Sequence, residues 1–122
     1  MELLRGCGYT LPDKACYELA VGESAADKAS YLLEELGLRG KSHFVCFHLG
    51  ANWEPKRWPP TYFAVLADLI DQAWQIPVIV TGSARDAALF DKMVAQVKRA
   101  RVFSLMGKTQ LDILGALYSQ AA

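Results

Sequence analysis

The sequence lacks an excess of charge of either sign, because 13 lysines and arginines balance 13 aspartates and glutamates over 122 residues. This balance argues against binding to nucleic acid or to an anionic membrane by bulk attraction, so any anion site must be local. The chain has no apolar run long enough to span a bilayer. Its N-terminus shows no basic region followed by an apolar core, as a signal peptide would. We therefore expect a cytoplasmic protein that binds no nucleic acid.

Cysteine is scarce, and Cys7, Cys16 and Cys46 lie far apart with no C-x-x-C pair. This spacing argues against a zinc site or a redox motif, and the odd number is typical of a reducing compartment. Cys46 lies inside an apolar run and is expected to be a small buried hydrophobic residue. With 52% hydrophobic and 21% charged residues, the chain is predicted to form at most one globular domain.

Several ligand-binding motifs are absent as well. No G-x-G-x-x-G follows an expected strand, and there is no G-x-S-x-G nucleophile elbow. The segment 106–109 reads Met-Gly-Lys-Thr, which ends like a P-loop but lacks the upstream glycine at the required spacing. Histidine, cysteine and acidic residues do not cluster at the spacing of metal ligands. These absences argue against a dinucleotide-binding fingerprint, a P-loop and a metal site.

Hydrophobic periodicity and turn residues divide the chain into alternating elements. Expected helices cover 24–37, 61–74, 83–98 and 109–118, and expected strands cover 43–48, 76–81 and 102–105. Capping boxes are predicted at Ser24–Asp27, Ser83–Asp86 and Thr109–Asp112, and a proline start at Pro59 and Pro60. The alternation predicts an α/β fold with a parallel sheet. Residues 1–22 are predicted to be a linker or arm, and 23–122 the domain.

The stretch His43–Pro60 organises the rest, because an apolar strand there leads into a long polar loop with Lys56 and Arg57. The carboxyl ends of parallel strands meet at one edge of a sheet. The loops expected to share that edge are 49–59, 82–84 and 106–109. Each ends at a helix N-terminus, where free N–H groups and the helix dipole favour an anion, and Lys108 adds a further positive charge.

Three segments in this order resemble glycosyltransferase family 9, the bacterial lipopolysaccharide heptosyltransferases that use ADP-heptose. They read GANWEPKRWPPTYFAVLADLI, VIVTGSARD and LMGKTQLDILGAL, and the resemblance covers about residues 24–122. It implies a three-layer, Rossmann-like parallel sheet that is part of the C-terminal, nucleotide-sugar-binding domain of a two-domain GT-B enzyme. The family's N-terminal acceptor domain, with its aspartate base, would precede residue 1. Its D-[ST]-G-x-x-H segment, which touches the donor phosphates, would follow the last helix.

The resemblance also assigns phosphate-binding roles. Lys56 matches the family's lysine that neutralises donor phosphate, and the alternative is a solvated loop lysine. Arg57 either joins the same site or pairs with Glu54 or another local carboxylate. Backbone N–H groups that would face the phosphates belong to Gly50, Ala51 and Asn52.

The nucleoside would lie beside the second and third loops. Asp86 stands where the family usually has a glutamate that hydrogen-bonds the ribose hydroxyls, but it is one methylene shorter and can instead cap a helix with Ser83. Residues expected near the adenine, mostly through their backbone, are Met106, Gly107, Lys108 and Thr109, with Gly82 at the preceding turn. His48 is expected to be a satisfied core histidine, and Trp58 a packing residue that fixes its loop.

The resemblance implies a function for the whole enzyme rather than for this chain alone. A heptose or related sugar would move from an ADP-sugar to a lipopolysaccharide-core acceptor, with metal-independent inversion, no cofactor and no catalytic residue in this chain. The enzyme would work in the cytoplasm, free or peripherally on the inner membrane. The alternative is a non-catalytic α/β module that binds a nucleotide or a protein partner. The genomic sequence on both sides of the chain would distinguish the two.

Overall fold

The structure is a computed structural model that describes residues 21–38 and 43–121. The helices are α2 (Glu23–Glu35), α3 (Pro60–Trp74), α4 (Ala87–Val94) and α5 (Leu111–Tyr118), and the strands are β1 (Val45–His48), β2 (Val78–Thr81) and β3 (Val102–Ser104). Short 3₁₀ turns at Glu54–Lys56 and Ala84–Asp86 precede α3 and α4. The arm predicted at 1–22 lies outside the described residues except for its last two.

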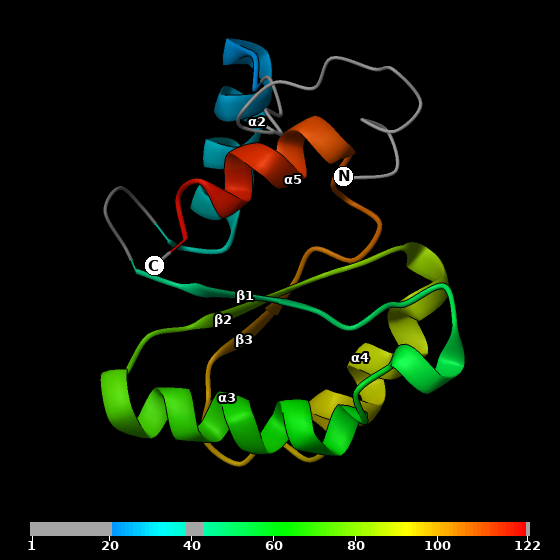
Figure 1. Cartoon of the computed structure of the whole chain (residues 1–122). Helices are drawn as coiled ribbons and strands as arrows, with labels where there is room; N and C mark the ends of the chain where they lie inside the picture. The colour runs from blue at the N-terminus through cyan, green and yellow to red at the C-terminus, as the bar shows by residue number, and fades with distance from the viewer. Residues whose placement is uncertain (1–20, 39–42, 122) are drawn as a thin grey trace, which may run out of the picture.

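The strands form a parallel sheet in the order β1-β2-β3. Helices α2 and α5 cover one face of this sheet, and α3 and α4 cover the other (Figure 1). This is the three-layer α/β arrangement that the alternation of strands and helices predicts. Because all described strands run in the same direction, the turns that follow β1, β2 and β3 lie on one edge of the sheet, as expected.

Strand β2 is the centre of the core because both of its faces are covered. Ile79 belongs to the buried cluster beneath α2 and α5, whereas Val78 and Val80 belong to the cluster beneath α3 and α4. Successive side chains of a strand point to opposite faces, so one apolar run serves both clusters. The continuous run Val78–Val80 in the sequence is therefore explained by burial on two sides.

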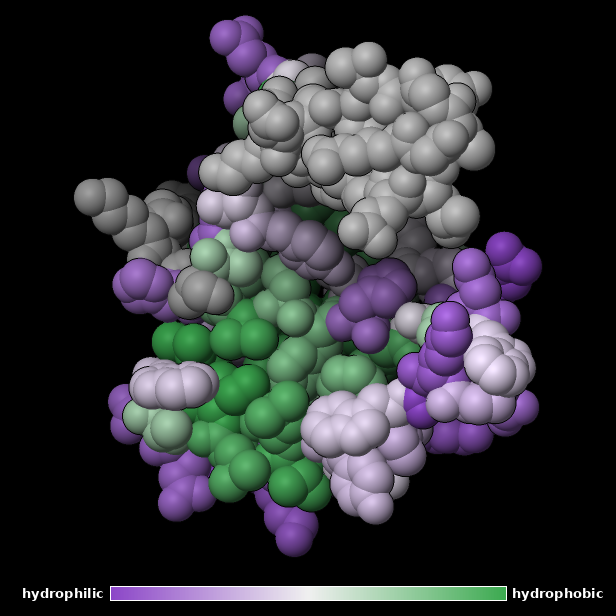
Figure 2. Space-filling view, in the orientation of Figure 1, coloured by the Kyte–Doolittle hydropathy of each residue, from purple (hydrophilic) through white to green (hydrophobic). Residues whose placement is uncertain are grey.

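Among the described residues, strand β1 pairs with β2 alone, and no described strand covers its other side. Figure 2 shows apolar residues gathered on the surface over β1 and α3. Cys46 is half-buried here and packs against the cluster beneath α2 and α5. Burial raises the pKa of its thiol to about 11, so the side chain stays protonated at neutral pH and behaves as the small hydrophobic residue that was predicted.

The second strand and the third predicted helix are both shorter than the sequence predicts. The strand expected from residue 76 begins at Val78, because Pro77 has no N–H to donate to a neighbouring strand. Its carbonyl still accepts the N–H of Val45 at 3.0 Å. The helix expected over 83–98 is a 3₁₀ turn followed by α4, which ends at Val94.

The capping boxes predicted at Ser24–Asp27 and Thr109–Asp112 are wrong. Gly22 is the N-cap of α2 and its carbonyl accepts the first helical N–H groups, so the predicted cap residue lies inside the first turn. Gln110 is the N-cap of α5 and makes no capping hydrogen bond with its side chain. The carboxylate of Asp112 accepts instead from the N–H of its neighbour Ile113 at 2.8 Å.

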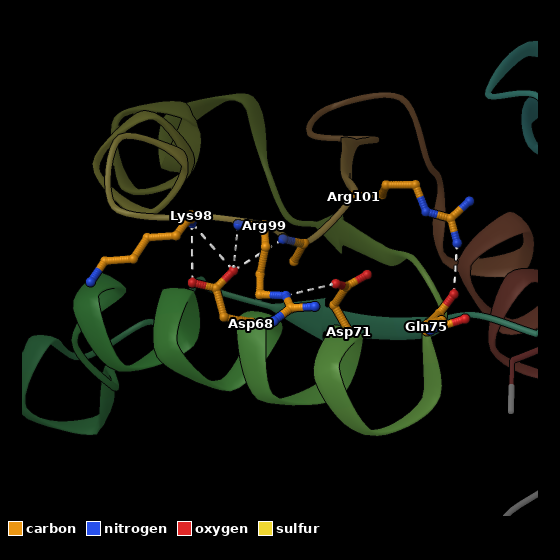
Figure 3. A network of polar contacts seen from close by, with 7 residues as sticks. Asp68, Asp71, Gln75, Lys98, Arg99 and Arg101 are labelled. Carbon is orange, nitrogen blue, oxygen red and sulfur yellow. Dashed lines mark hydrogen bonds and ion pairs between the residues drawn. The ribbon is translucent and has the colours of Figure 1, made fainter.

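Asp68 on α3 determines how the chain turns after α4 (Figure 3). Its carboxylate accepts the backbone N–H groups of Lys98, Arg99 and Ala100 at 3.0 to 3.3 Å. Partial burial works to raise the pKa of Asp68, but these three donors and the Lys98 charge outweigh it and lower the pKa. Backbone groups that a longer α4 would use internally are thus held by α3, which explains why the helix ends early.

Asp68→Ala should lower the free energy of unfolding by about 1–3 kcal/mol, because three backbone N–H groups lose their acceptor. The matched control is Asp71→Ala on the same helix, whose carboxylate meets the exposed Arg99 side chain at 3.3 Å. An ion pair of that kind should cost less than about 1 kcal/mol when removed. Urea unfolding at pH 7 measures both variants.

The pH dependence of the Asp68 effect is fixed in sign. Because the pKa is lower in the folded state, the stabilisation is complete above the unfolded pKa of about 3.9 and is lost as the pH falls through the folded pKa. The difference in unfolding free energy between wild type and Asp68→Ala should therefore shrink below about pH 4. A difference that stays constant into strong acid would contradict this account.

Candidate functional site

A cavity of about 360 Å³ opens at the edge of the sheet where β1 and β2 end. Its walls come from the loop after β1 and from the turn after β2. The residues that line it are His48, Gly50, Ala51, Asn52, Arg57, Ser83, Arg85 and Asp86. A volume of this size falls in the range of small-molecule sites. Its position is the one where open parallel sheets bind their ligands.

The loop after β1 is anchored at its start by Leu49, which is buried in the cluster beneath α3 and α4. Gly50 follows directly and faces the turn after β2. A Cβ atom at position 50 would lie 2.7 Å from Oδ2 of Asp86, which is closer than real Cβ contacts. A side chain here would displace the Asp86 carboxylate, so glycine allows the loop after β1 to lie against Asp86.

Asp86 joins the turn after β2 to the loop after β1. Its Oδ2 accepts from the Ser83 hydroxyl at 2.6 Å and from the Ser83 N–H at 3.2 Å, which confirms the predicted capping box. The Ser83 hydroxyl is the main cause of a lowered pKa for the Asp86 carboxyl. Partial burial opposes this lowering, whereas the Ser83 N–H, the Arg57 charge and the nearby His48 imidazole add to it. The carboxylate is thus ionised and already hydrogen-bonded at neutral pH.

Arg57 closes over the same loop, where it both lines the cavity and meets a carboxylate. Its Nε donates to the Ala51 carbonyl at 3.1 Å, and one terminal nitrogen lies 3.9 Å from Oδ1 of Asp86. The carboxylate that it meets is therefore Asp86 rather than Glu54. At 3.9 Å and with partial exposure the ion pair is weak, so the guanidinium keeps most of its donors for a ligand.

Lys56 lies outside the set of residues that line the cavity. Its Nζ is 5.9 Å from the centre of the Trp53 ring, and both side chains are exposed. Trp58 packs edge-on against Phe63 with ring centres 4.9 Å apart, which agrees with its predicted packing role. The cation that the cavity holds from this loop is thus Arg57, with Lys56 one residue away.

The third loop supports the second and does not line the cavity. The Gly107 N–H donates to the Gly82 carbonyl at 2.8 Å, and a Cβ at Gly82 would lie 2.7 Å from the sulfur of Met106. These contacts hold the turn after β2 in place. Lys108 and Thr109 also lie outside the lining. Of the residues predicted for adenine, none reaches this cavity directly.

Three lining residues were missed as ligand candidates, and one of them, Ser83, was predicted only as a helix cap. The prediction of a buried core role for His48 is wrong, because the side chain is exposed and lines the cavity, although its Nδ1 does pair with Thr81. A histidine that ends a strand at the carboxyl edge points past the core, which could have indicated this. Arg85 lies in the 3₁₀ turn after β2 and was passed over in favour of the capping residues around it.

A family model described as glycosyltransferase family 9 (heptosyltransferase) matches residues 9–122. The chain belongs to glycosyltransferase family 9. The two loops that form the walls of the cavity lie largely in two of the three segments on which the predicted resemblance rested. A search of curated proteins found no match.

Two solved glycosyltransferases share the fold. A family 9 glycosyl transferase from Veillonella parvula has a TM-score of 0.84 and 22% identity over 98% of this chain. The E. coli ADP-heptose lps heptosyltransferase II has a TM-score of 0.71 and 31% identity over 91% of this chain. In each case the match covers 34% of the solved chain, so this family 9 chain spans about a third of those enzymes. Its fold is a Rossmann-like part of a GT-B glycosyltransferase.

No described helix is long and apolar enough to cross a membrane. Within the same residues, histidine, cysteine, aspartate and glutamate form no group that could hold a metal ion. The polar groups of the cavity are instead arginines, a histidine, hydroxyl and amide groups and one carboxylate. This set is suited to phosphate and hydroxyl groups.

Asp86→Asn should lower the free energy of unfolding by about 0.5–2 kcal/mol, the range for a lost helix cap. The reason is that Ser83 and Arg57 lose a charged acceptor. The control is Asp112→Asn in the first turn of α5, whose carboxylate bonds only the adjacent backbone and should matter less. Chemical unfolding at pH 7 measures both variants.

The lowered pKa of Asp86 again fixes the sign of the pH dependence. Its stabilisation is complete above the unfolded pKa of about 3.9 and is lost as the pH falls through the folded pKa. If Asp86→Asn and Asp112→Asn destabilise the chain equally, the capping role is refuted.

Proposed function

We propose that this chain is the donor-binding part of a family 9 glycosyltransferase that uses ADP-heptose or a closely similar ADP-sugar. The observation that carries the proposal is the arginine-lined cavity at the carboxyl edge of the sheet in a chain that matches the family over residues 9–122. The 31% identity to an enzyme named for ADP-heptose supports the choice of donor. The acceptor of the whole enzyme would be the core of lipopolysaccharide.

The diphosphate of the donor would occupy the space between Gly50 and Arg57. Backbone N–H groups of the loop from Gly50 to Asn52 and the Arg57 guanidinium favour an anion there. Lys56 would add a mobile ammonium from the same loop. Arg85 brings a second cation from the opposite wall. The pocket therefore supplies local positive charge in a chain with no net charge.

The nucleoside would lie on the side of the turn after β2. A ribose contact by Asp86 would have to share a carboxylate whose Oδ2 already accepts from Ser83 and whose Oδ1 faces Arg57. The adenine would lie near Met106 to Thr109, which pack beside that turn. These placements follow the family resemblance and the neighbourhood of the loops.

In this mechanism the chain stabilises the leaving group and does not supply the base. A carboxylate in the acceptor domain would take the proton from the acceptor hydroxyl as it attacks the anomeric carbon with inversion. The bond from that carbon to the diphosphate oxygen breaks, and ADP departs with the developing negative charge. Cations and backbone N–H groups placed beforehand stabilise that charge, which requires no metal ion.

Lys56→Ala should weaken ADP binding about tenfold to a hundredfold, because a charge-assisted contact is typically worth roughly 1.5–3 kcal/mol. Arg57→Ala, one residue along, should have at least as large an effect because that side chain lines the cavity. Isothermal titration with ADP measures both variants. Lys28→Ala on α2 is the matched control, since it removes one positive charge from the opposite side of the sheet.

Thermal melting of the same variants separates binding from folding, and an exposed substitution should change stability by less than about 0.5 kcal/mol. Lys56→Arg should restore only part of the affinity, because the planar guanidinium meets phosphate differently. If Lys56→Ala binds ADP like wild type while Arg57→Ala does not, Arg57 and the backbone carry the anion. If neither variant differs from wild type, the phosphate site is misplaced.

The chain alone should bind donor without transferring sugar, because the proposed base belongs to the acceptor domain. The measurement is ADP release from ADP-heptose in the presence of a lipopolysaccharide-core acceptor, with a complete family 9 enzyme as positive control. Enzyme-dependent ADP release by the 122-residue chain would contradict the assignment of the base.

A further inference from the structure

Thr81, the last residue of β2, is fully buried beneath the cavity and its hydroxyl has three polar neighbours. The Oγ1 atom lies 3.2 Å from the Phe47 carbonyl, 3.1 Å from the Tyr118 hydroxyl and 3.3 Å from Nδ1 of His48. His48 and Thr81 are also paired in the register of β1 and β2. The parallel pairing itself therefore places the imidazole beside this hydroxyl.

Counting hydrogens assigns the tautomer of His48. A threonine hydroxyl has one hydrogen to donate and two lone pairs to accept with. The Thr81 hydroxyl donates to the Phe47 carbonyl at 3.2 Å, which uses its one hydrogen. The remaining partners must then donate to Thr81, which puts a hydrogen on the Tyr118 oxygen and on Nδ1 of His48. In the neutral ring Nε2 consequently keeps its lone pair and is a hydrogen-bond acceptor.

Thr81 does not need His48 for its own satisfaction. The Thr81 hydroxyl already donates to Phe47 and accepts from Tyr118. The contact with His48 is therefore additional to one acceptor and one donor that Thr81 has without it. His48 is exposed and lines the cavity, with one ring nitrogen committed to the wall. The contact with Thr81 therefore orients the ring and leaves Nε2 to act elsewhere.

The other groups of the cavity show which ligand atom Nε2 suits. Arg57 and Arg85 offer only donors from their side chains, and the one carboxylate, Asp86, already accepts from Ser83. The phosphate oxygens of a nucleotide accept hydrogen bonds, as Nε2 does, so the two cannot form a hydrogen bond with each other. The donors of a nucleotide sugar are its hydroxyl groups and the adenine amino group. The adenine is proposed to lie near Met106 to Thr109, outside the lining of this cavity, so a hydroxyl group is the donor that Nε2 would meet.

We propose that Nε2 of His48 accepts a hydrogen bond from a hydroxyl group of the bound nucleotide sugar. The proposal rests on the proposed function, because it requires a nucleotide sugar in this cavity. It makes His48 a ligand-binding residue whose ring is positioned by Thr81. The hydroxyl belongs either to the ribose or to the transferred sugar, and binding measurements can tell these apart.

The test is His48→Asn in the full 122-residue chain. An asparagine amide can keep the donor to Thr81 but has nothing in the place of Nε2. Tyr118→Phe is the matched control, because it removes the other donor to Thr81 from outside the cavity. Isothermal titration with ADP, ADP-heptose and inorganic pyrophosphate is combined with thermal melting of each variant.

His48→Asn should bind nucleotide roughly three- to tenfold more weakly, as expected for one neutral hydrogen bond, and melt like wild type. Loss for ADP and ADP-heptose alike assigns the ribose hydroxyl, and loss for ADP-heptose alone assigns the sugar. Pyrophosphate, which has no such hydroxyl, should bind the variant as it binds wild type. Tyr118→Phe should keep its affinity for all three probes.

Unchanged affinity of His48→Asn for both nucleotides would overturn the proposal while leaving the donor site intact. An equal loss for pyrophosphate would overturn it as well, since His48 would then donate to phosphate. If the wild-type chain binds neither ADP nor ADP-heptose, the proposed function fails and this proposal fails with it.

Discussion

Parallel pairing of β1, β2 and β3 brings the end of every described strand to one edge of the sheet, and the rest of the site depends on that constraint. Register then decides which side chains meet there. His48 and Thr81 are paired positions, so a histidine that ends β1 lies beside a buried hydroxyl that ends β2. The loops that follow inherit this spacing, which is why Gly50 and Asp86 touch although they are far apart in sequence.

The walls of the cavity are held together by contacts within the protein. Leu49 anchors one wall in the core, the Gly107 N–H and the Met106 sulfur brace the other, and Asp86 joins the two through Ser83 and Arg57. Groups fixed in this way do not have to reorganise when charge develops on a leaving group, which is the usual basis of electrostatic catalysis. The same arrangement suits a family 9 chain whose proposed part in transfer is to hold the donor.

The sequence predicts the fold well because apolar periodicity and strand-helix alternation depend on local residues. It also predicts the Ser83–Asp86 cap and the edge on which the loops meet. Long-range contacts explain the failures. The early end of α4 depends on Asp68 of α3, about 30 residues away in sequence, and the choice of Asp86 as the partner of Arg57 depends on how two loops pack. Exposure of His48 depends on where the strand ends relative to the core, which periodicity does not reveal.

The most direct test of the central claim is an amide chemical-shift titration of the isotopically labelled chain with ADP. The account predicts the largest shifts at residues 48–52, at Arg57 and at 83–86, with smaller shifts in the supporting loop at 106–109. Amides held by Asp68 at residues 98–100, on the opposite edge of the sheet, should not move. Saturable shifts centred on 98–100, or no shifts at millimolar ADP, would contradict a donor site at the carboxyl edge.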